Sequence, residues 1–233
     1  MSASPYELST SPDVLARLHP RLRAYFGAVP SGHVGRGEGV FDVVGTPRRW
    51  LWPVLALLAR DGVVFPVWER DVPFTVENRP VRVGRGTTAG RGTTAGRGTA
   101  AGREARVAVR AHRTFRFRTG TRTMVDALTA EPGGLVDHLG RRGRVSAELD
   151  VAVDDEGALR LVSTRVTFRV LGVRLRLPAP VAPRVTLVER FDDEADVQRV
   201  SLVLTAPVVG TLYRYEGAFR YAVVPDPVPE GEQ

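Results

Sequence analysis

Apolar and polar side chains alternate with a period of two through most of the chain beyond Val63, and this pattern limits the folds that the chain can adopt. Successive side chains of a β-strand point to opposite faces, so each alternating segment is expected to be a strand with one buried face. The segment 106–118 is the cleanest example, because apolar residues and arginines occupy opposite faces: Val107, Val109, Ala111, Phe115 and Phe117 against Arg106, Arg110, Arg116 and Arg118. The apolar faces of several such strands must meet in a common interior.

The regular spacing of these segments indicates an antiparallel architecture. Turn residues separate neighbouring segments, and Asp154-Asp155-Glu156-Gly157 is typical of a hairpin turn. We expect about ten strands, which predicts a mainly β chain with minor α: a large antiparallel, strongly curved sheet or a barrel. The segments that support this prediction are 34–44, 63–68, 73–76, 106–118, 145–153, 159–161, 166–170, 173–177, 185–191, 197–205 and 212–224.

Two helical segments precede most of the strands. Ser11-Pro12-Asp13 is typical of a helix start and predicts helical structure over about 11–27, while Thr46-Pro47 begins a second segment over about 46–61. Residues 84–103 repeat the units GRGTTA, GRGTTA and GRGTAA, so we expect a disordered basic loop inserted into one β-rich domain, 1–224. Residues 225–233 form an acidic, proline-rich tail that is also expected to be disordered.

The net charge of +7 comes from one part of the chain. Residues 81–123 contain eleven arginines and a single acid, Glu104, so the remainder of the chain is slightly acidic. The repeat loop has no aromatic side chain on which a single-stranded nucleic acid could stack. Specific nucleic-acid binding is therefore not expected, and non-specific attraction of the loop to an anionic surface is kept as an alternative.

Sequence motifs for cofactors and metals are missing. The chain has no cysteine, which excludes disulfides and thiolate chemistry, and its four histidines do not have metal-ligand spacing. Gly35, Gly37 and Gly39 would suit a phosphate-binding loop, but neither a helix start nor a P-loop lysine follows them. Alternate glycines in a strand more often mark a bend or the close approach of an aromatic ring. The sequence therefore predicts no cofactor and no metal.

Two charged residues lie on the apolar faces of their own strands. Arg113 interrupts the apolar face of 106–118, and Glu189 interrupts that of 185–191. Burying a charge alone costs several kcal/mol, so each residue needs a partner or a wet cavity. One hypothesis is that the two side chains pair inside the barrel and orient the polar end of a ligand. The alternative is a structural ion pair, or a bulge that turns one of them outward.

Three further candidates for a ligand site lie in later strands. Tyr213 and Tyr215 share the aromatic face of the last strand, and Asp137 lies in the polar phrase LVDHLG. The adjacent His138 would point to the opposite face of a strand, so the two side chains cannot easily bond to each other. Because no nucleophile, zincin or dinucleotide motif is present, we assign no catalytic residue. An enzyme that acts on a lipophilic substrate through carboxylates is the alternative, and the chain is more readily interpreted as a non-enzyme.

The stretch 65–78, FPVWERDVPFTVEN, is dense in aromatic, proline and charged residues. We interpret Glu69–Asp71 as a corner that joins two strand segments, because prolines suit strand ends. Glu77 lies near the far end of this stretch and is expected to meet Arg113 in the ligand site.

The segment 46–61 is apolar nearly all round and contains the longest apolar run of the chain, Trp50–Ala59. That run is too short to span a membrane, which takes about 20 residues. We expect a buried helix that covers the sheet; weak contact with a membrane surface, which Arg48, Arg49 and Arg60 would favour, is the alternative. Because the N-terminal residues contain no apolar signal-peptide core, the expected compartment is the cytoplasm.

Several phrases in the chain resemble, in order, those of an uncharacterised bacterial domain family of unknown function. They are Gly35-Arg36-Gly37, RDVPFTVEN (Arg70–Asn78), RTFRF (Arg113–Phe117), TMVDAL (Thr123–Leu128), VDHLG (Val136–Gly140) and YRYEGAF (Tyr213–Phe219). The resemblance implies one domain with no known activity, so it assigns no catalytic residue. Members of that family are sometimes fused to an NAD(P)-binding domain of the saccharopine-dehydrogenase type, but this sequence contains no such segment. The family more usually has an aromatic residue at the position of His138, which argues against a catalytic histidine.

Together these features predict a binding module that holds an apolar or amphipathic small molecule inside the barrel. A barrel of this size can be filled by side chains or can hold one small ligand. The observation that decides between these outcomes is whether the interior contains a cavity that Arg113 and Glu189 face.

Overall fold

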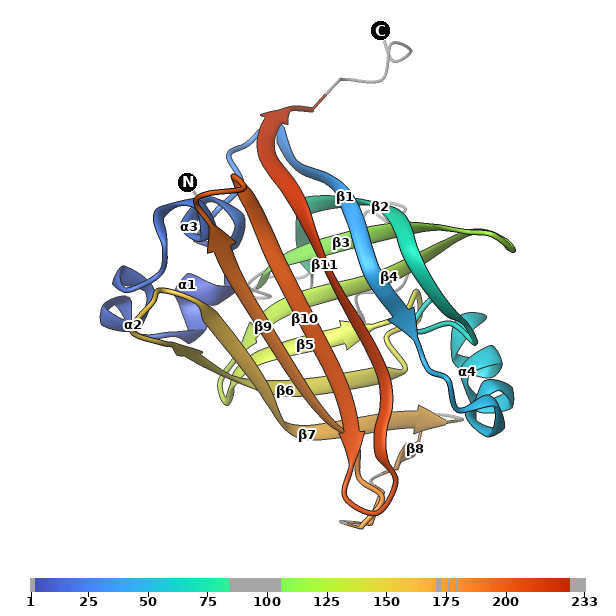
Figure 1. The fold of residues 1–233 in the computed structure, drawn as a ribbon. Helices are drawn as coiled ribbons and strands as arrows, with labels where there is room; N and C mark the ends of the chain where they lie inside the picture. The colour runs from blue at the N-terminus through green and yellow to red at the C-terminus, as the bar shows by residue number, and fades with distance from the viewer. Residues whose placement is uncertain (1–2, 84–105, 171–172, 176, 179, 227–233) are drawn as a thin grey trace, which may run out of the picture.

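The computed structural model shows a closed antiparallel barrel of ten strands, which confirms the predicted fold class (Figure 1). The structure describes residues 3–83, 106–170, 173–175, 177–178 and 180–226. The elements are α1 (Pro5–Ser9), α2 (Pro12–Ala16), α3 (Pro20–Phe26), β1 (His33–Gly45), the 3-10 turn η1 (Arg49–Leu51), α4 (Trp52–Ala59), β2 (Trp68–Val83), β3 (Arg106–Phe117), β4 (Gly120–Glu131), β5 (Gly134–Leu139), β6 (Val145–Val153), β7 (Leu159–Val170), β8 (Val173–Leu175), β9 (Arg184–Asp192), β10 (Val197–Ala206) and β11 (Gly210–Pro225).

The barrel is a meander that is split at one place. Consecutive strands pair from β1 to β7 and from β9 to β11, and β1 pairs with β11. The first part of β7, 159–162, pairs with β9, whereas its last part, 168–170, pairs with the short strand β8. Ser163 is buried where β7 and β9 diverge, and its hydroxyl accepts a hydrogen bond from the Val185 N–H at 2.8 Å. The wall of the barrel is therefore forked towards the ends of β7 and β8.

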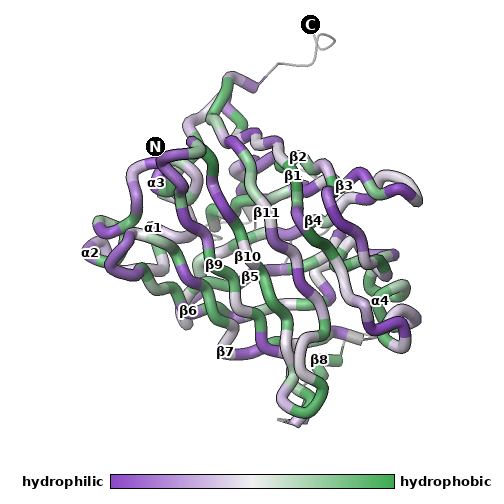
Figure 2. The backbone as a smooth tube through the Cα atoms, in the orientation of Figure 1, coloured by the Kyte–Doolittle hydropathy of each residue, from purple (hydrophilic) through white to green (hydrophobic). Residues whose placement is uncertain are grey.

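The alternating pattern directs apolar side chains into the barrel, and Figure 2 shows polar and apolar residues alternating along the strands. Phenylalanine and tyrosine rings from β1, β2, β3 and β11 fill one part of the interior, with centroids 4.5–5.8 Å apart: Phe41, Phe74, Phe115, Phe117, Tyr215 and Phe219. The expected approach of an aromatic ring to the glycine face of β1 is confirmed, since a Cβ added to Gly35 would lie 1.6 Å from Tyr221 Oη.

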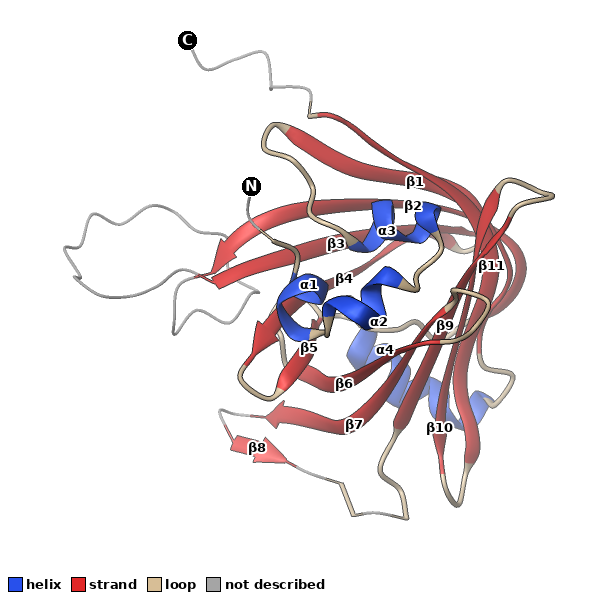
Figure 3. Ribbon diagram, turned by 90° about the vertical axis from the view of Figure 1, so that its left-hand side faces the viewer, coloured by secondary structure: helices blue, strands red, loops and turns tan. Residues whose placement is uncertain are grey.

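Three short helices enter one end of the barrel, and α4 covers part of the other end (Figure 3). Tyr6 of α1 and Leu22 and Phe26 of α3 are buried against residues of β4 to β7. The predicted helical segment 11–27 is divided at Pro20 as expected, whereas α1 was not predicted. Ser4 begins α1 with a capping box, in which its side chain accepts from the Glu7 N–H and Glu7 accepts from the Ser4 N–H.

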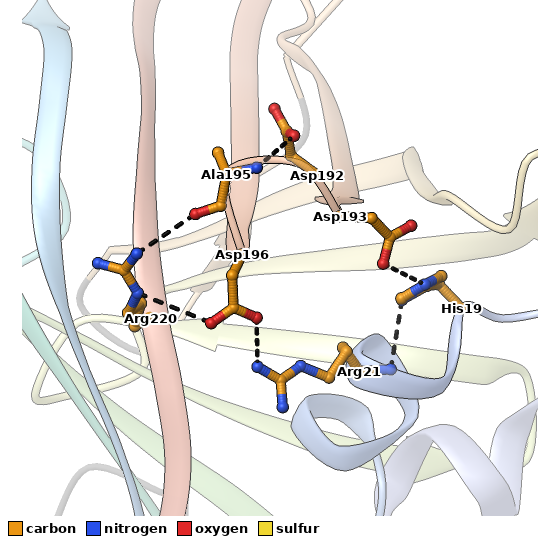
Figure 4. A network of polar contacts seen from close by, with 7 residues as sticks. All are labelled: His19, Arg21, Asp192, Asp193, Ala195, Asp196 and Arg220. Atoms are coloured by element: carbon orange, nitrogen blue, oxygen red, sulfur yellow. Dashed lines mark hydrogen bonds and ion pairs between the residues drawn. The ribbon is translucent and has the colours of Figure 1, made fainter.

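A polar network fastens α3 to the barrel (Figure 4). Asp196, in the turn between β9 and β10, accepts a hydrogen bond from Arg21 at 2.6 Å and lies 3.9 Å from Arg220 of β11. His19, at the start of α3, lies 3.4 Å from Asp193 and stacks on the Phe191 ring. The helices therefore close this end of the barrel through both apolar packing and polar contacts.

Two local predictions are wrong. Glu69–Asp71 is not a corner, because β2 runs without interruption from Trp68 to Val83. The backbone irregularity in this stretch is the positive φ of 54° at Asp71, within the strand. The helix in 46–61 is buried on one face only: Leu55 is 5% exposed, but Val54 and Leu57 are 58% and 63% exposed. The predicted repeat loop, 84–103, and nearly all of the predicted tail lie outside the described residues. Among the helices of the described residues, none has the length and apolarity needed to cross a membrane.

Candidate functional site

The aromatic cluster does not fill the whole barrel, and a cavity of about 540 Å³ remains inside it. Residues of nearly every strand, together with side chains of α1, α3 and α4, form its wall. Most of the wall is apolar, with Met124, Leu128, Leu149, Leu161 and Leu187 as examples. A cavity of this volume falls within the range of pockets that hold one drug-sized molecule.

Charged side chains from four strands lie on this wall. Arg113 of β3 and Asp126 of β4 are diagonal neighbours, because Ala111 lies opposite Asp126 and Arg113 lies opposite Met124. Their side chains form an ion pair, in which Asp126 is 2% exposed and Arg113 is 18% exposed. Asp137 of β5 and Glu189 of β9 complete the charged lining of the cavity among the described residues.

Glu189 is buried among apolar residues of the neighbouring strands. It lies opposite Val200 of β10 and Leu159 of β7, is 4% exposed, and accepts a hydrogen bond from the Gln198 side chain. Burial raises the pKa of Glu189 to about 7, although the hydrogen bond from Gln198 and the positive charge of Arg113 act in the opposite direction. This carboxyl therefore changes its protonation state near neutral pH.

Asp137 is the second perturbed carboxyl. It projects inward between Leu128 of β4 and Ala147 of β6, and burial raises its pKa to about 6 against the opposing effect of Arg113. Its Oδ1 atom is buried and has no hydrogen-bond partner among the described residues. The residue as a whole keeps intermediate exposure because its remaining surface faces the cavity.

The helices bring tyrosines to the same charged cluster. Burial would lower the pKa of Arg113, but the nearby acidic groups of Tyr25, Tyr215, Asp137 and Glu189 outweigh it and raise that pKa. Burial itself raises the pKa of Tyr25, and the negative charge of Glu189 acts in the same direction. Arg113 is therefore a permanent cation, and the charged cluster lies against α3.

Five of the six candidate residues line this cavity: Arg113, Asp137, Glu189, Tyr213 and Tyr215. Arg113 and Glu189 both face it, but each has a different direct partner, Asp126 and Gln198, so they do not form a simple pair with each other.

Glu77 is the exception, and the expectation that it meets Arg113 is wrong. Val76 and Asn78 are buried on the inner face of β2, so Glu77 must point outward, where it contacts Arg79 at 2.6 Å and Arg36 at 3.4 Å. It borders a separate groove of about 850 Å³ beside α3. The arginines and the histidine that line this groove are exposed.

Sequence reasoning missed three polar residues of the inner wall: Asn78, Asp126 and Gln198. Asn78 shares a strand parity with buried Val76, and Gln198 shares one with buried Val200, so strict use of the alternation would have found them. Asp126 gave no such signal, because all residues from Met124 to Thr129 are buried and β4 shows no polar face there.

The cavity reaches solvent beside α4 and β8. Wall residues at this mouth are exposed by 42–63%: Val54, Leu57, Leu175, Leu177 and Val181. A hydrogen bond of 3.3 Å from the Val208 N–H to the Pro180 carbonyl connects the β10–β11 turn to the same region. The opposite end lies beneath α1 and α3, which contribute Tyr6, Tyr25 and Phe26 to the wall.

The described residues offer no cluster of three or more metal-ligating side chains. His138 points away from the cavity, and its Nε2 lies 3.0 Å from Thr129 Oγ1 on the same side of the sheet. Burial lowers the pKa of His138 and so favours its neutral form. It does not join Asp137 in an acid–base pair.

Comparison with known proteins gives one family match. A family model described as "Domain of unknown function (DUF4166)" matches residues 18–100 and 87–219. No curated protein and no solved structure matches the chain. Each of the five longer phrases on which the resemblance was based contributes a side chain to the cavity wall: Asn78, Arg113, Asp126, Asp137 and Tyr215.

Proposed function

The chain belongs to the family described as "Domain of unknown function (DUF4166)", a description that names no activity, and we propose that this member is a binding protein that holds one amphipathic small molecule inside its barrel. The observation that supports the proposal is a mostly apolar cavity of about 540 Å³ with a few charged side chains gathered on its wall. Such a combination is typical of ligand pockets, in which apolar walls supply affinity and a few polar groups fix orientation.

The direction of entry supports an amphipathic ligand. Half-exposed apolar residues surround the mouth, while Arg113, Asp137 and Glu189 lie deeper in the wall near Tyr6 and Tyr25. An apolar tail would occupy the part near α4, and the polar end would contact the charged cluster.

A cavity-filling variant tests this function. Ala147 of β6 is 2% exposed and lines the cavity, so Ala147→Phe should occupy part of it. Binding of the neutral apolar dye Nile red, followed by its fluorescence, is expected to weaken by roughly tenfold or more, equivalent to about 1.4 kcal/mol. Ala152→Phe is the matched control, because Ala152 lies on the same strand but is exposed. Equal dye binding by both variants and the unmodified protein would contradict a ligand in the barrel.

Carboxylate-dependent catalysis on a lipophilic substrate in the same cavity is a second candidate. It is favoured by two carboxyls whose pKa values burial raises to about 6 and about 7, which suits proton transfer near neutral pH. Native mass spectrometry of protein purified from its own host distinguishes the two functions: a binding protein retains an unaltered ligand, whereas an enzyme converts a ligand added in excess. Conversion that Asp137→Asn or Glu189→Gln abolishes would establish the enzyme.

A further inference from the structure

The charged groups on the cavity wall are unequal in number. Three carboxyl side chains, Asp126, Asp137 and Glu189, accompany a single guanidinium, that of Arg113. Arg113 is already engaged by Asp126 in a direct ion pair. Two acidic side chains therefore remain without a matching cation among the described residues of the wall.

Most of the unused hydrogen-bonding capacity of the wall is that of acceptors, and the exception is the Tyr213 hydroxyl, which can also donate. Asp137 Oδ1 and Asn78 Oδ1 are buried, line the cavity and have no hydrogen-bond partner among the described residues. Glu189 receives one hydrogen bond from Gln198, and a carboxyl group has further lone pairs to offer. A buried acceptor without a donor is unfavourable, so the wall is complementary to a ligand that brings N–H or O–H groups.

A carboxylate at the polar end of the ligand would meet the wrong charges. It would lie close to two acidic side chains in a poorly solvated cavity, where like charges repel strongly. It would also have to compete with Asp126 for the guanidinium of Arg113. An ammonium group, in contrast, both donates hydrogen bonds and balances the excess acidic charge.

We propose that the polar end of the ligand is a hydrogen-bond donor, best a protonated amine, that contacts Asp137 and Glu189, and that the cavity rejects fatty carboxylates. This inference depends on the proposed binding function. The expected ligands are amphipathic amines, and alcohols are expected to bind more weakly.

Three probes with the same tail test the inference: decylamine, 1-decanol and decanoate. Each competes with Nile red at about pH 8, above the pKa of both carboxyls, and dye fluorescence reports displacement. Decylamine is expected to bind roughly 10- to 100-fold more tightly than decanoate, the range for one hydrogen bond to a charged group, with 1-decanol between them. Decanoate binding as tightly as decylamine would refute the preference.

Asp137→Asn should reduce the advantage of decylamine over 1-decanol by roughly tenfold. The control is Asp150→Asn, which removes the same charge from an exposed position of the neighbouring strand β6 and should change nothing. An unchanged preference in Asp137→Asn, with the thermal transition intact, would also refute the inference. If none of the three probes displaces the dye or stabilises the protein, the proposed binding function fails and the inference fails with it.

A second inference comes from the outer surface at the mouth. The apolar side chains Trp50, Val54, Leu57, Val173 and Val208 are 58–75% exposed, and the elements that carry them gather at one end of the barrel (Figures 1 and 3). Exposed apolar groups of this kind mark interaction surfaces in soluble proteins.

The connections at this end of the barrel are rich in arginine. The connections at this end of the barrel contain one acid, Asp61, which is 7% exposed and accepts a hydrogen bond from the Arg142 N–H. Exposed arginines in the same connections are Arg48, Arg49, Arg60, Arg118, Arg141, Arg142 and Arg144. Two described turns at the opposite end are acidic instead, Asp154–Glu156 and Asp192–Asp196. The described connections at the mouth are therefore more basic than these two turns.

From this arrangement we infer that the mouth docks on an anionic lipid bilayer, with Trp50, Val54 and Leu57 entering the headgroup region. Apolar side chains beside basic residues are the combination that binds such interfaces. Each arginine near an anionic surface adds attraction, which salt weakens. A hydrophobic ligand could then pass between bilayer and cavity without crossing water.

Vesicle flotation tests the docking. The protein is expected to float with vesicles that contain phosphatidylglycerol and to stay unbound with phosphatidylcholine alone. Leu57→Ser should lower partitioning by roughly tenfold, because several buried methylene groups are lost. Val40→Ser is the matched control, since Val40 is 46% exposed on the barrel wall.

Equal flotation with both lipids would overturn the docking, and so would flotation of Leu57→Ser equal to that of the unmodified protein. A third contrary result is binding to a DNA oligonucleotide that depends on Arg48 and Arg49 but not on Leu57. The last would assign the basic end to nucleic acid. Circular dichroism confirms that each variant remains folded.

Discussion

Glu189 should make the ligand-free protein less stable as the pH rises towards neutral. Burial raises the pKa of this carboxyl from 4.5 to about 7. Below about pH 4 both the folded and the unfolded chain hold the proton, so the group has no effect on stability. Between the two pKa values the unfolded chain releases the proton first, and the free energy of unfolding falls. Above about pH 7 both states are ionised and the loss is complete.

The loss amounts to roughly 3 kcal/mol, since one pKa unit corresponds to about 1.4 kcal/mol. Glu189→Gln carries no ionisable proton and can still bond to the Gln198 side chain. Its advantage over the unmodified protein should therefore be small near pH 4 and should grow to roughly 3 kcal/mol near pH 8. For a domain of this size that difference corresponds to roughly 6–12 °C in the thermal midpoint.

Urea unfolding at a series of pH values, followed by circular dichroism, measures this difference directly. Glu194→Gln is the control, because Glu194 is exposed in the β9–β10 turn, and its curve should parallel that of the unmodified protein. An advantage of Glu189→Gln that is independent of pH, or that grows towards acid, would refute the assignment of Glu189 as a buried, destabilising carboxyl.

Other perturbations give distinct results. Arg113→Met leaves Asp126 buried without its partner and should cost about 3–5 kcal/mol in urea unfolding, whereas the double variant with Asp126→Leu should recover most of that loss; equal stability of the single and double variants would contradict the ion pair. Gly35→Ala forces its Cβ against the Tyr221 ring and should cost about 1–3 kcal/mol, and Tyr221→Ala in the same chain should remove the penalty of the added methyl. Asp196→Asn breaks exposed contacts to α3 and should change stability by about 1 kcal/mol or less, but hydrogen exchange in α3 should accelerate.

The barrel could be predicted from the sequence because period-two alternation is a local property of each strand. Arg113 and Glu189 were recognised as inward-facing for the same reason, since each breaks an otherwise apolar face. The rule failed where it was not applied strictly: Glu77 has the opposite parity to Val76 and therefore cannot reach the interior. The Ser4–Glu7 capping box that begins α1 was legible in the sequence as well.

Other features depend on contacts between distant segments. Both faces of β4 are covered from Met124 to Thr129, partly because the Val125 N–H bonds to Gly62, so no alternation marks Asp126 as a cavity residue. The fork between β7 and β9 depends on how β8 competes for the same strand edge, and pairing partners are not encoded in the hydropathy of one strand. Similarly, the apolar residues of α4 indicated burial, but that helix packs on the barrel through one face, with Leu55 buried and Val54 and Leu57 exposed.

The proposed ligand would account for the buried charges, which stability alone does not explain. An ion pair such as Arg113–Asp126 is often no more stabilising than hydrophobic side chains of the same volume. Asp137 adds a further cost, because burial raises its pKa to about 6 and one of its oxygens has no hydrogen-bond partner among the described residues. Leu128 and Ala147, its neighbours across β4 and β6, show that apolar residues fit the same wall. A ligand that donates hydrogen bonds would offset these costs, so its binding should raise the thermal midpoint most at a pH where both carboxyls are ionised.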